Sequence, residues 1–138
     1  AMVERTRAAT YTDQELARGM PARLRSRYFT RAGDRWQARA DLRAMVEVTR
    51  ANLLDPAPSA RRFDLILVRN VLIYFDAAGK RRALDAIHGA LAPDGALLIG
   101  TGENLTDPRY EPRTSGRTVV YRPRGTPRTT APSPLEHP

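Results

Sequence analysis

The segment Phe63–Val68, with the sequence FDLILV, constrains the fold of this chain more than any other. Its nearly continuous apolar character is typical of a central parallel strand whose two faces are both covered by helices. A helix is expected from the N-cap residue Asp76 to about Leu91, followed by a second apolar strand at residues 96–99. A strand, a crossover helix and a strand within about 40 residues make a βαβ unit, so the sequence predicts an α/β fold.

The remaining C-terminal residues add one more strand to this unit. Pro93, Asp94 and Gly95 predict a turn before the second apolar strand. Residues 118–121, Thr-Val-Val-Tyr, predict a last strand. We therefore expect a mostly parallel sheet whose last strand is antiparallel.

Upstream, the sequence predicts two short helices. Thr12 and Glu15 stand in capping-box register at the start of the first helix. Pro21 occupies a favourable first position of the second helix, which is expected to end near Arg27.

A small antiparallel β region is expected after these helices. Residues 28–30 and 35–38 favour two strands joined by an Ala-Gly-Asp turn, and residues 45–48 favour a further strand. The final residues are rich in Pro, Thr, Arg and Ser, a composition typical of disorder. The expected divisions are a truncated leader at 1–10, short helices and a small β subdomain at 11–48, the main α/β part at 49–122 and a disordered tail at 123–138.

Composition narrows the classes of function. The net charge is +8, but Lys80 is the single lysine beside 22 arginines that are spread along the chain, so no nucleic-acid partner is expected. The chain has no cysteine, and no apolar run approaches the roughly 20 residues that span a bilayer. We expect a cytoplasmic protein that does not insert into membranes. No metal site is expected, because His88 has no partner at ligand spacing and His137 falls in the tail.

A segment that contains polar residues follows each expected strand. These segments are residues 49–53 (TRANL), 69–75 (RNVLIYF) and 100–104 (GTGEN). In open parallel sheets, ligands bind in the crevice beyond the carboxyl ends of the strands. The three segments are therefore expected to line one cleft.

Residues 69–76, RNVLIYFD, resemble the most characteristic motif of the chemotaxis receptor (CheR-type) methyltransferases. Other parts resemble the family in order and spacing, over about residues 4 to 121. These are Asn52-Leu53, the LAPDG turn at 91–95, the GTGEN segment at 100–104, and Tyr11 with RYF at 27–29. The RNxxIYF string is specific, whereas many methyltransferases share the Pro-x-Gly turn.

The resemblance implies a partial Rossmann-like, class I methyltransferase sheet with a small antiparallel β insertion. It implies S-adenosylmethionine as cofactor and methylation of glutamate side chains on the cytoplasmic region of chemoreceptors. Asn52 and Leu53 would lie beside the adenine, Arg69 and Asn70 would border the methionine and adenosine portion, and Tyr74 would be the catalytic residue at the reacting end. In some members the β insertion docks a receptor tail.

Elementary chemistry agrees with such a reaction. A glutamate is already ionised near neutral pH, so it needs no general base to attack a sulfonium methyl group. The enzyme must hold carboxylate and methyl in line and offset the carboxylate charge, which suits arginine. Tyr74 can offer an aromatic face to the sulfonium.

Parts of the family pattern have no counterpart in this sequence. There is no Gly-rich cofactor loop, no acidic strand end for the ribose and no N-terminal helical domain, and Gly102 stands where the family usually has serine. A truncated sheet would leave a strand edge unpaired, which invites association. The alternatives are a poorly folding fragment, self-association, or a complementing chain that carries the missing half.

Each site residue also has a structural explanation that needs no ligand. Asn52 is an ordinary turn residue, Arg69 is solvated or pairs with Asp64 or Asp76, and Glu103 is a surface carboxylate. Tyr74 and Phe75 are core residues in this interpretation. The corresponding functions are a degenerate, non-catalytic protein-binding module, or a basic nucleic-acid-binding protein.

Overall fold

The computed structural model describes residues 2–55, 61–116 and 118–125, which fall in two compact units, 1–51 and 52–138. The expected disordered tail at 123–138 lies mostly outside the described residues. Pro123 is the last residue of a strand, and the Arg124 N–H donates to Arg109 O over 2.8 Å. No helix in the described ranges has the length and apolar character that crossing a membrane requires.

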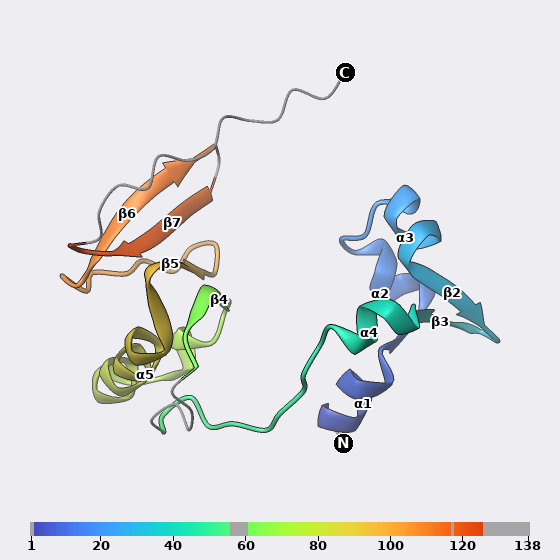
Figure 1. Cartoon of the computed structure of the whole chain (residues 1–138), viewed down its shortest axis with the longest axis horizontal. Coiled ribbons are helices and arrows are strands. Elements are labelled where there is room, and N and C mark those ends of the chain that lie inside the picture. The colour runs from blue at the N-terminus through green and yellow to red at the C-terminus, as the bar shows by residue number, and fades with distance from the viewer. Residues whose placement is uncertain (1, 56–60, 117, 126–138) are drawn as a thin grey trace. The chain divides into compact units, whose positions relative to one another are not determined.

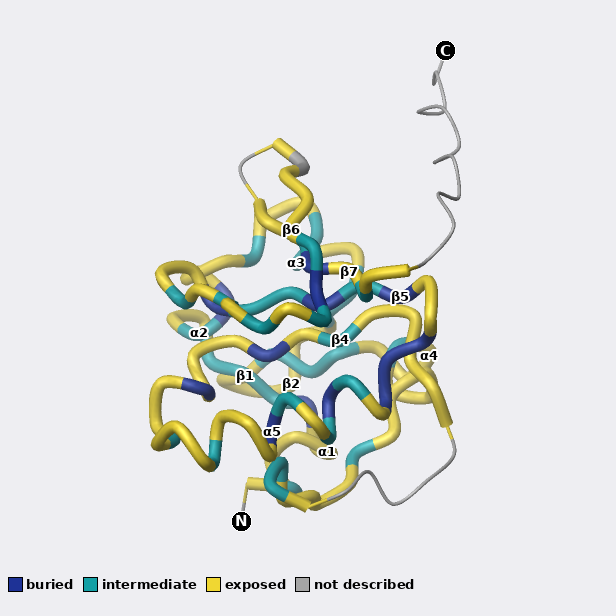
Figure 2. The backbone as a smooth tube through the Cα atoms, turned by 90° about the vertical axis from the view of Figure 1, so that its left-hand side faces the viewer, coloured by how far each residue is buried: buried dark blue, intermediate teal, exposed yellow. Residues whose placement is uncertain are grey.

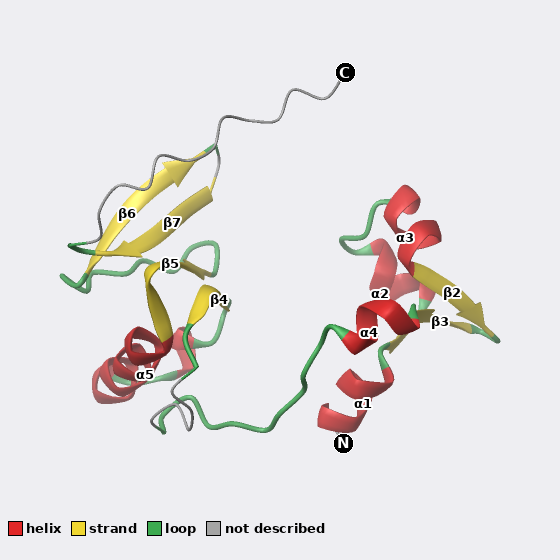
Figure 3. Cartoon of the chain, in the orientation of Figure 1, coloured by secondary structure: helices red, strands yellow, loops and turns green. Residues whose placement is uncertain are grey.

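The first unit combines short helices with a three-stranded antiparallel sheet of order β1-β3-β2 (Figure 3). Its elements are α1 (Met2–Ala8), β1 (Thr10–Tyr11), α2 (Asp13–Ala17), α3 (Ala22–Tyr28), β2 (Phe29–Ala32), β3 (Arg35–Ala38) and α4 (Ala40–Ala44). The predicted capping box is confirmed, because Thr12 Oγ1 accepts from Glu15 N while Thr12 N donates to Glu15 Oε2. The predicted hairpin is also present, with Gly33 at φ 62° in its turn.

Polar contacts around Trp36 link α2, α3, β2 and β3 in this unit, whose buried apolar residues among those described are only Ala9 and Leu16. Trp36 Nε1 donates to Asp13 Oδ1 over 2.7 Å, and Arg31 Nη1 donates to the other Asp13 oxygen over 2.9 Å. The guanidinium groups of Arg25 and Arg31 lie 5.0 and 5.2 Å from the indole centroid, within the range of cation–π attraction.

The strand expected at residues 45–48 is absent. Met45 caps α4, and the residues after it form no ladder, with Met45 and Val46 exposed by 81% and 62%. Alternation alone was misleading because a strand also needs a partner, and in the described part of the chain residues 45–48 belong to neither sheet. The two-residue strand β1, which pairs with β3, was not predicted.

The second unit is a four-stranded sheet of order β4-β5-β7-β6 with one long helix (Figure 1). Its elements are β4 (Phe63–Val68), the 3-10 helix η1 (Leu72–Tyr74), α5 (Ala77–Ala90), β5 (Leu91–Ile99), β6 (Tyr110–Ser115) and β7 (Thr118–Pro123). β4 and β5 are parallel and are joined through α5, which confirms the predicted βαβ unit. β7 is antiparallel to β5, as expected for the last strand, and β6 was not predicted.

The core of this unit lies between α5 and one face of the sheet. Ala83 and Ile87 of α5 are exposed by 0% and 3%, and Leu91 and Leu97 of β5 by 2% and 0%. Figure 2 shows buried residues along α5 and β5 in dark blue. Partly buried Leu84 and Phe75 pack against this cluster, so the apolar stripe predicted on the helix does face the core.

β4 is an edge strand in the described part of the chain, not a central strand with both faces covered. Only Val68 is buried, while Phe63, Leu65 and Leu67, which alternate onto the opposite face from Ile66 and Val68, are exposed by 48%, 53% and 61%. Among the described elements of this unit, α5 covers one face, and nothing covers the other. β4 and β6 are the two edge strands of this sheet in the described part of the chain.

The turn predicted at residues 93–95 is incorporated into β5. The ladder jumps from the pair Phe63↔Leu91 to Leu65↔Ala96, so β5 bulges between the two pairs. A Cβ on Gly95 would lie 2.8 Å from Leu91 Cδ1 and 3.0 Å from Phe63 O. Only glycine fits this close approach of two backbones.

Candidate functional site at the carboxyl edge of β4 and β5

The carboxyl ends of β4 and β5 lie side by side. Their last ladder pair is Val68↔Ile99, so Arg69 and Gly100 leave the sheet at the same edge. Arg69 and Asn70 are both exposed, and Gly100 is buried. The structure thus brings together two of the three polar segments expected from the sequence.

Asn70 begins the connection from β4 to α5 in a left-handed conformation, with φ at 58°. The chain then forms η1, in which Leu72 is buried and packs in the core. Tyr74 is 80% exposed, whereas Phe75 is half-buried and packs against the core. The interpretation of both aromatic residues as core is therefore wrong for Tyr74 and right for Phe75.

Arg69 is exposed at the end of β4. In the described part of the chain it pairs with neither Asp64 nor Asp76. Asp76 instead caps α5, because its Oδ1 accepts from Gly79 N over 2.7 Å. Arg69 therefore remains available to an external anion.

Glu103 is not a simple surface carboxylate, contrary to the expectation for an isolated glutamate. It is half-buried, and its Oε2 accepts from Asn70 N over 3.0 Å and from Gly100 N over 2.7 Å. The sequence motif contained Glu103, but only the pairing of β4 with β5 brings Asn70 within its reach. This residue is absent from the predicted set of site residues.

The loop that carries Glu103 is anchored to β7. Tyr121 is 5% exposed, and its hydroxyl donates to Asn104 Oδ1 over 3.3 Å and accepts from Leu105 N over 3.4 Å. Leu105 also packs against the core. The loop beyond β5 is thus attached through three consecutive residues, Glu103, Asn104 and Leu105.

Asn52 and Leu53 form a separate turn in the same unit. Asn52 Oδ1 accepts from Leu54 N, and Leu54 O accepts from Arg82 Nη2 of α5, both over 3.2 Å. Leu53 is half-buried against the core. Among the described contacts, no hydrogen bond joins this turn to Arg69, Asn70 or Tyr74.

A cavity of about 850 Å³ lies between η1, α5 and the loop after β5. At one end Arg109 pairs with Asp85 over 2.8 Å and with Asp107 over 2.6 Å. These hydrogen bonds lower the pKa of Asp107 and raise that of Arg109. Glu103 lines this cavity as well as the strand edge, whereas none of the five site residues predicted from the sequence (Asn52, Leu53, Arg69, Asn70 and Tyr74) does. The lining residues are Leu72, Ile73, Ala77, Lys80, Arg81, Leu84, Asp85, Gly102, Glu103, Asn104, Leu105, Thr106, Asp107, Pro108 and Arg109.

Tyr110, which follows Arg109 in the sequence, is 2% exposed. Its ring contacts the His88 ring edge-on, with the ring centroids 5.4 Å apart. Burial raises the pKa of Tyr110 to about 12. His88 thus packs against a buried aromatic ring. Within the described ranges, no cluster of three or more His, Asp or Glu side chains could hold a metal ion.

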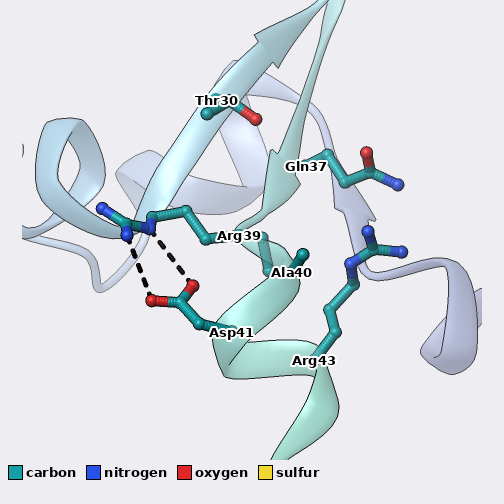
Figure 4. A pocket seen from close by; sticks show the side chains of 7 residues that line it. Thr30, Gln37, Arg39, Ala40, Asp41 and Arg43 are labelled. Atoms are coloured by element: carbon teal, nitrogen blue, oxygen red, sulfur yellow. Dashed lines mark hydrogen bonds and ion pairs between the residues drawn. The ribbon is translucent and has the colours of Figure 1, made fainter.

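The first unit has its own cavity of about 440 Å³, lined by residues of β2, β3 and α4. Figure 4 shows Arg39 and Asp41 facing each other beside it, joined by two contacts of 3.2 and 3.1 Å. The Arg39 guanidinium holds the pKa of Asp41 below its usual value. This arginine is thus neutralised internally, unlike Arg69.

Comparison with known proteins identifies the family. A family model described as CheR methyltransferase, SAM binding domain, matches residues 1–120. The chain is 37% identical over 126 residues to Chemotaxis protein methyltransferase 1 of Pseudomonas aeruginosa, covering 88% of this chain and 46% of that protein. It is 38% identical over 105 residues to Chemotaxis protein methyltransferase Cher2 of Pseudomonas putida, covering 75% and 38%.

A further relative has a name that refers to biofilm formation. The Probable biofilm formation methyltransferase WspC of Pseudomonas aeruginosa is 32% identical over 104 residues, covering 74% of this chain and 24% of that protein. The chain spans less than half the length of each of these relatives. The chain belongs to the CheR methyltransferase SAM-binding domain family, whose cofactor is S-adenosylmethionine.

Proposed function

We propose that this chain takes part in S-adenosylmethionine-dependent methylation of glutamate side chains on chemotaxis receptors. The observation that carries the proposal is the carboxyl edge of β4, where Arg69 and Asn70 are exposed beside the end of a parallel neighbour. This is the edge at which open parallel sheets bind ligands. The family match and the names of the relatives support S-adenosylmethionine-dependent methyl transfer in chemotaxis.

The side chains at this edge suit the chemistry of the cofactor. The Arg69 guanidinium can pair with a carboxylate, and the Asn70 amide can both donate to and accept from polar groups of the methionine and adenosine portion. Tyr74 offers an exposed ring and hydroxyl to a cationic sulfonium. The turn at Asn52 and Leu53 offers an amide and an apolar side chain to the adenine.

In this proposal the cofactor supplies the methyl group, and the protein supplies alignment and charge. The receptor carboxylate is ionised near neutral pH, so the chain need not provide a general base. Arg69 offsets negative charge at the strand edge. Tyr74 stands at the reacting end as the catalytic residue and shields it from water. Holding the reactants in line accounts for the acceleration.

Calorimetric titration of the purified chain with S-adenosylhomocysteine tests the proposal. We expect saturable binding that Asn70→Ala weakens and that Thr114→Ala, an exposed change on β6, leaves unaltered. Failure of the folded chain to bind millimolar ligand would reject cofactor binding by this chain. Where binding is found, transfer of labelled methyl groups to a purified chemoreceptor cytoplasmic region tests the reaction itself.

A second candidate is a protein-binding module formed by the first unit. β1 and β2 are the two edge strands of its sheet in the described residues, and free strand edges can accept an added peptide strand. Binding of the chemoreceptor region by a chain that neither binds S-adenosylhomocysteine nor transfers methyl groups would favour this alternative.

A further inference from the structure

The left-handed conformation of Asn70 needs an explanation. A non-glycine residue with positive φ is disfavoured by its Cβ, although asparagine tolerates it better than most residues. Of the described non-glycine residues, Ala9 and Asn70 have positive φ, at 48° and 58°. Ala9 follows a helix end in the first unit, whereas Asn70 stands at the proposed cofactor edge.

The carboxylate of Glu103 holds this conformation from across the sheet edge. One oxygen, Oε2, accepts from Asn70 N over 3.0 Å and from Gly100 N over 2.7 Å. Hydrogen bonds to a charged acceptor are roughly twice as strong as neutral ones. Glu103 N donates to Gly100 O over 3.0 Å, so a short turn directs the side chain back to the strand ends.

The junction is closely packed around Gly100. A Cβ on Gly100 would overlap Glu103 Oε2 and would lie 2.8 Å from Asn70 N and 3.2 Å from Asn70 Cγ. The side chain of Asn70 therefore lies against the Gly100 backbone. Asn70, Gly100 and Glu103 thus form one packed, hydrogen-bonded contact between the two strand ends. In this contact Glu103 sets the position of Asn70.

We propose that Glu103 is a positioning residue for cofactor binding. Its carboxylate fixes Asn70 in the left-handed conformation and thereby holds the Asn70 side-chain amide in place for S-adenosylmethionine. The inference rests on the proposed function of this edge. Glu103 itself acts through Asn70 and need not touch the cofactor.

A double-mutant cycle in the full chain tests this role. The affinity for S-adenosylhomocysteine is measured by calorimetry for the wild type, Glu103→Ala, Asn70→Gly and the double variant, with urea unfolding of each in parallel. Because the left-handed conformation costs an ordinary residue energy that Glu103 offsets, we expect Glu103→Ala to weaken binding roughly 5- to 30-fold. Glycine adopts positive φ freely but lacks the amide, so Asn70→Gly should weaken binding as well.

The decisive result is the absence of additivity. If Glu103 acts through the Asn70 side chain, then Glu103→Ala has no further effect on affinity in the Asn70→Gly background. Glu103→Gln keeps an acceptor oxygen and loses the charge, so its affinity should fall between those of the wild type and Glu103→Ala. Glu111→Ala on β6, which removes a partly exposed carboxylate paired with Arg113, is the matched control and should bind as the wild type does.

Two results overturn the inference while leaving the proposed function standing. One is a Glu103→Ala chain that unfolds more easily but binds with unchanged affinity when folded, which would mean a purely structural role. The other is full additivity of the two substitutions. A folded wild-type chain that does not bind S-adenosylhomocysteine rejects the proposed function and the inference together.

Discussion

At the scale of single residues, Tyr74 and Phe75 are consecutive aromatic side chains with opposite surroundings. Tyr74 is 80% exposed, and Phe75 packs against the core of the second unit. Exposure without packing leaves Tyr74 free for a ligand. The same property removes any large contribution to stability, which allows the two roles to be measured separately.

Tyr74→Ala is expected to change the free energy of unfolding by less than about 0.5 kcal/mol, as is usual for surface substitutions. Because the ring is proposed to face a sulfonium, the substitution should weaken S-adenosylmethionine binding about two- to fivefold more than binding of the uncharged S-adenosylhomocysteine. Calorimetry with both ligands and urea unfolding measure these effects. Equal weakening for both ligands would contradict the proposed placement of Tyr74. Phe75→Ala is the contrasting variant and should lower stability by about 1–3 kcal/mol.

The buried phenol of Tyr110 predicts that the stability of the chain depends on pH in the alkaline range. Burial raises its pKa to about 12, and its hydroxyl has no hydrogen-bond partner among the described groups. Because the pKa of Tyr110 is higher in the folded state than in the unfolded state, its contribution to the free energy of unfolding is complete below about pH 10. That contribution is lost as the pH rises toward 12. Tyr110→Phe should therefore reduce the alkaline loss of stability. Near neutral pH it should be neutral or stabilise by up to about 1–2 kcal/mol, because an unpaired buried hydroxyl is removed. Urea unfolding of the wild type and Tyr110→Phe across this pH range measures the difference. Equal alkaline losses of stability would contradict the assignment of this pH dependence to Tyr110.

At the scale of elements, α5 depends on its N-cap residue, Asp76. Asp76 Oδ1 accepts from Gly79 N over 2.7 Å. Asp76→Ala should lower the free energy of unfolding by about 1 kcal/mol. Asp76→Ser retains a capping oxygen and should lower it by only about a few tenths of a kcal/mol. Urea denaturation compares the two variants with the wild type. Equal losses for alanine and serine would mean that the side chain acts by something other than capping.

The bulge in β5 requires glycine, and the helix before it offers a matched control. A Cβ on Gly95 would approach Leu91 Cδ1 to 2.8 Å and Ala92 O to 3.0 Å, whereas a Cβ on Gly89 of α5 would meet nothing within 4 Å. Gly95→Ala should destabilise the chain by about 1–3 kcal/mol through overpacking. Gly89→Ala should stabilise it by about 0.5–1 kcal/mol, since alanine is the better helix former. Thermal or urea unfolding that showed the same sign for both would contradict this account.

At the scale of the whole molecule, the edge strand β4 predicts association, because apolar side chains on one of its faces are exposed in the described part of the chain. An apolar edge strand with unpaired backbone groups is a template for pairing with another chain. Leu65 is 53% exposed on this strand, and Val119 is 43% exposed on β7, which has a neighbour on each side. Leu65→Lys should reduce concentration-dependent association measured by sedimentation, and Val119→Lys should reduce it less. Association unchanged by Leu65→Lys would place the contact elsewhere.

Local signals predicted the elements that depend on few residues. The capping box at Thr12 and Glu15, the N-cap at Asp76 and the parallel pair around α5 are all confirmed. β6 was missed because its sequence, YEPRTS, contains proline and charged residues, and its strand form comes from pairing with β7. For the site, the sequence placed Arg69 and Asn70 at a strand end. It could not place Glu103, because a contact across 33 residues depends on how two strands pair.

The sequence by itself determined the βαβ unit, the family and the positions of the polar residues along the chain. Periodicity, caps and motifs are properties of neighbouring residues, so they can be read without a fold. Only the tertiary structure decided that β4 is an edge strand, that Tyr74 is exposed while Phe75 packs, and that one carboxylate joins Asn70 to Gly100. Each of these depends on which distant surfaces meet, and burial and hydrogen bonding between distant residues are set when the sheet assembles.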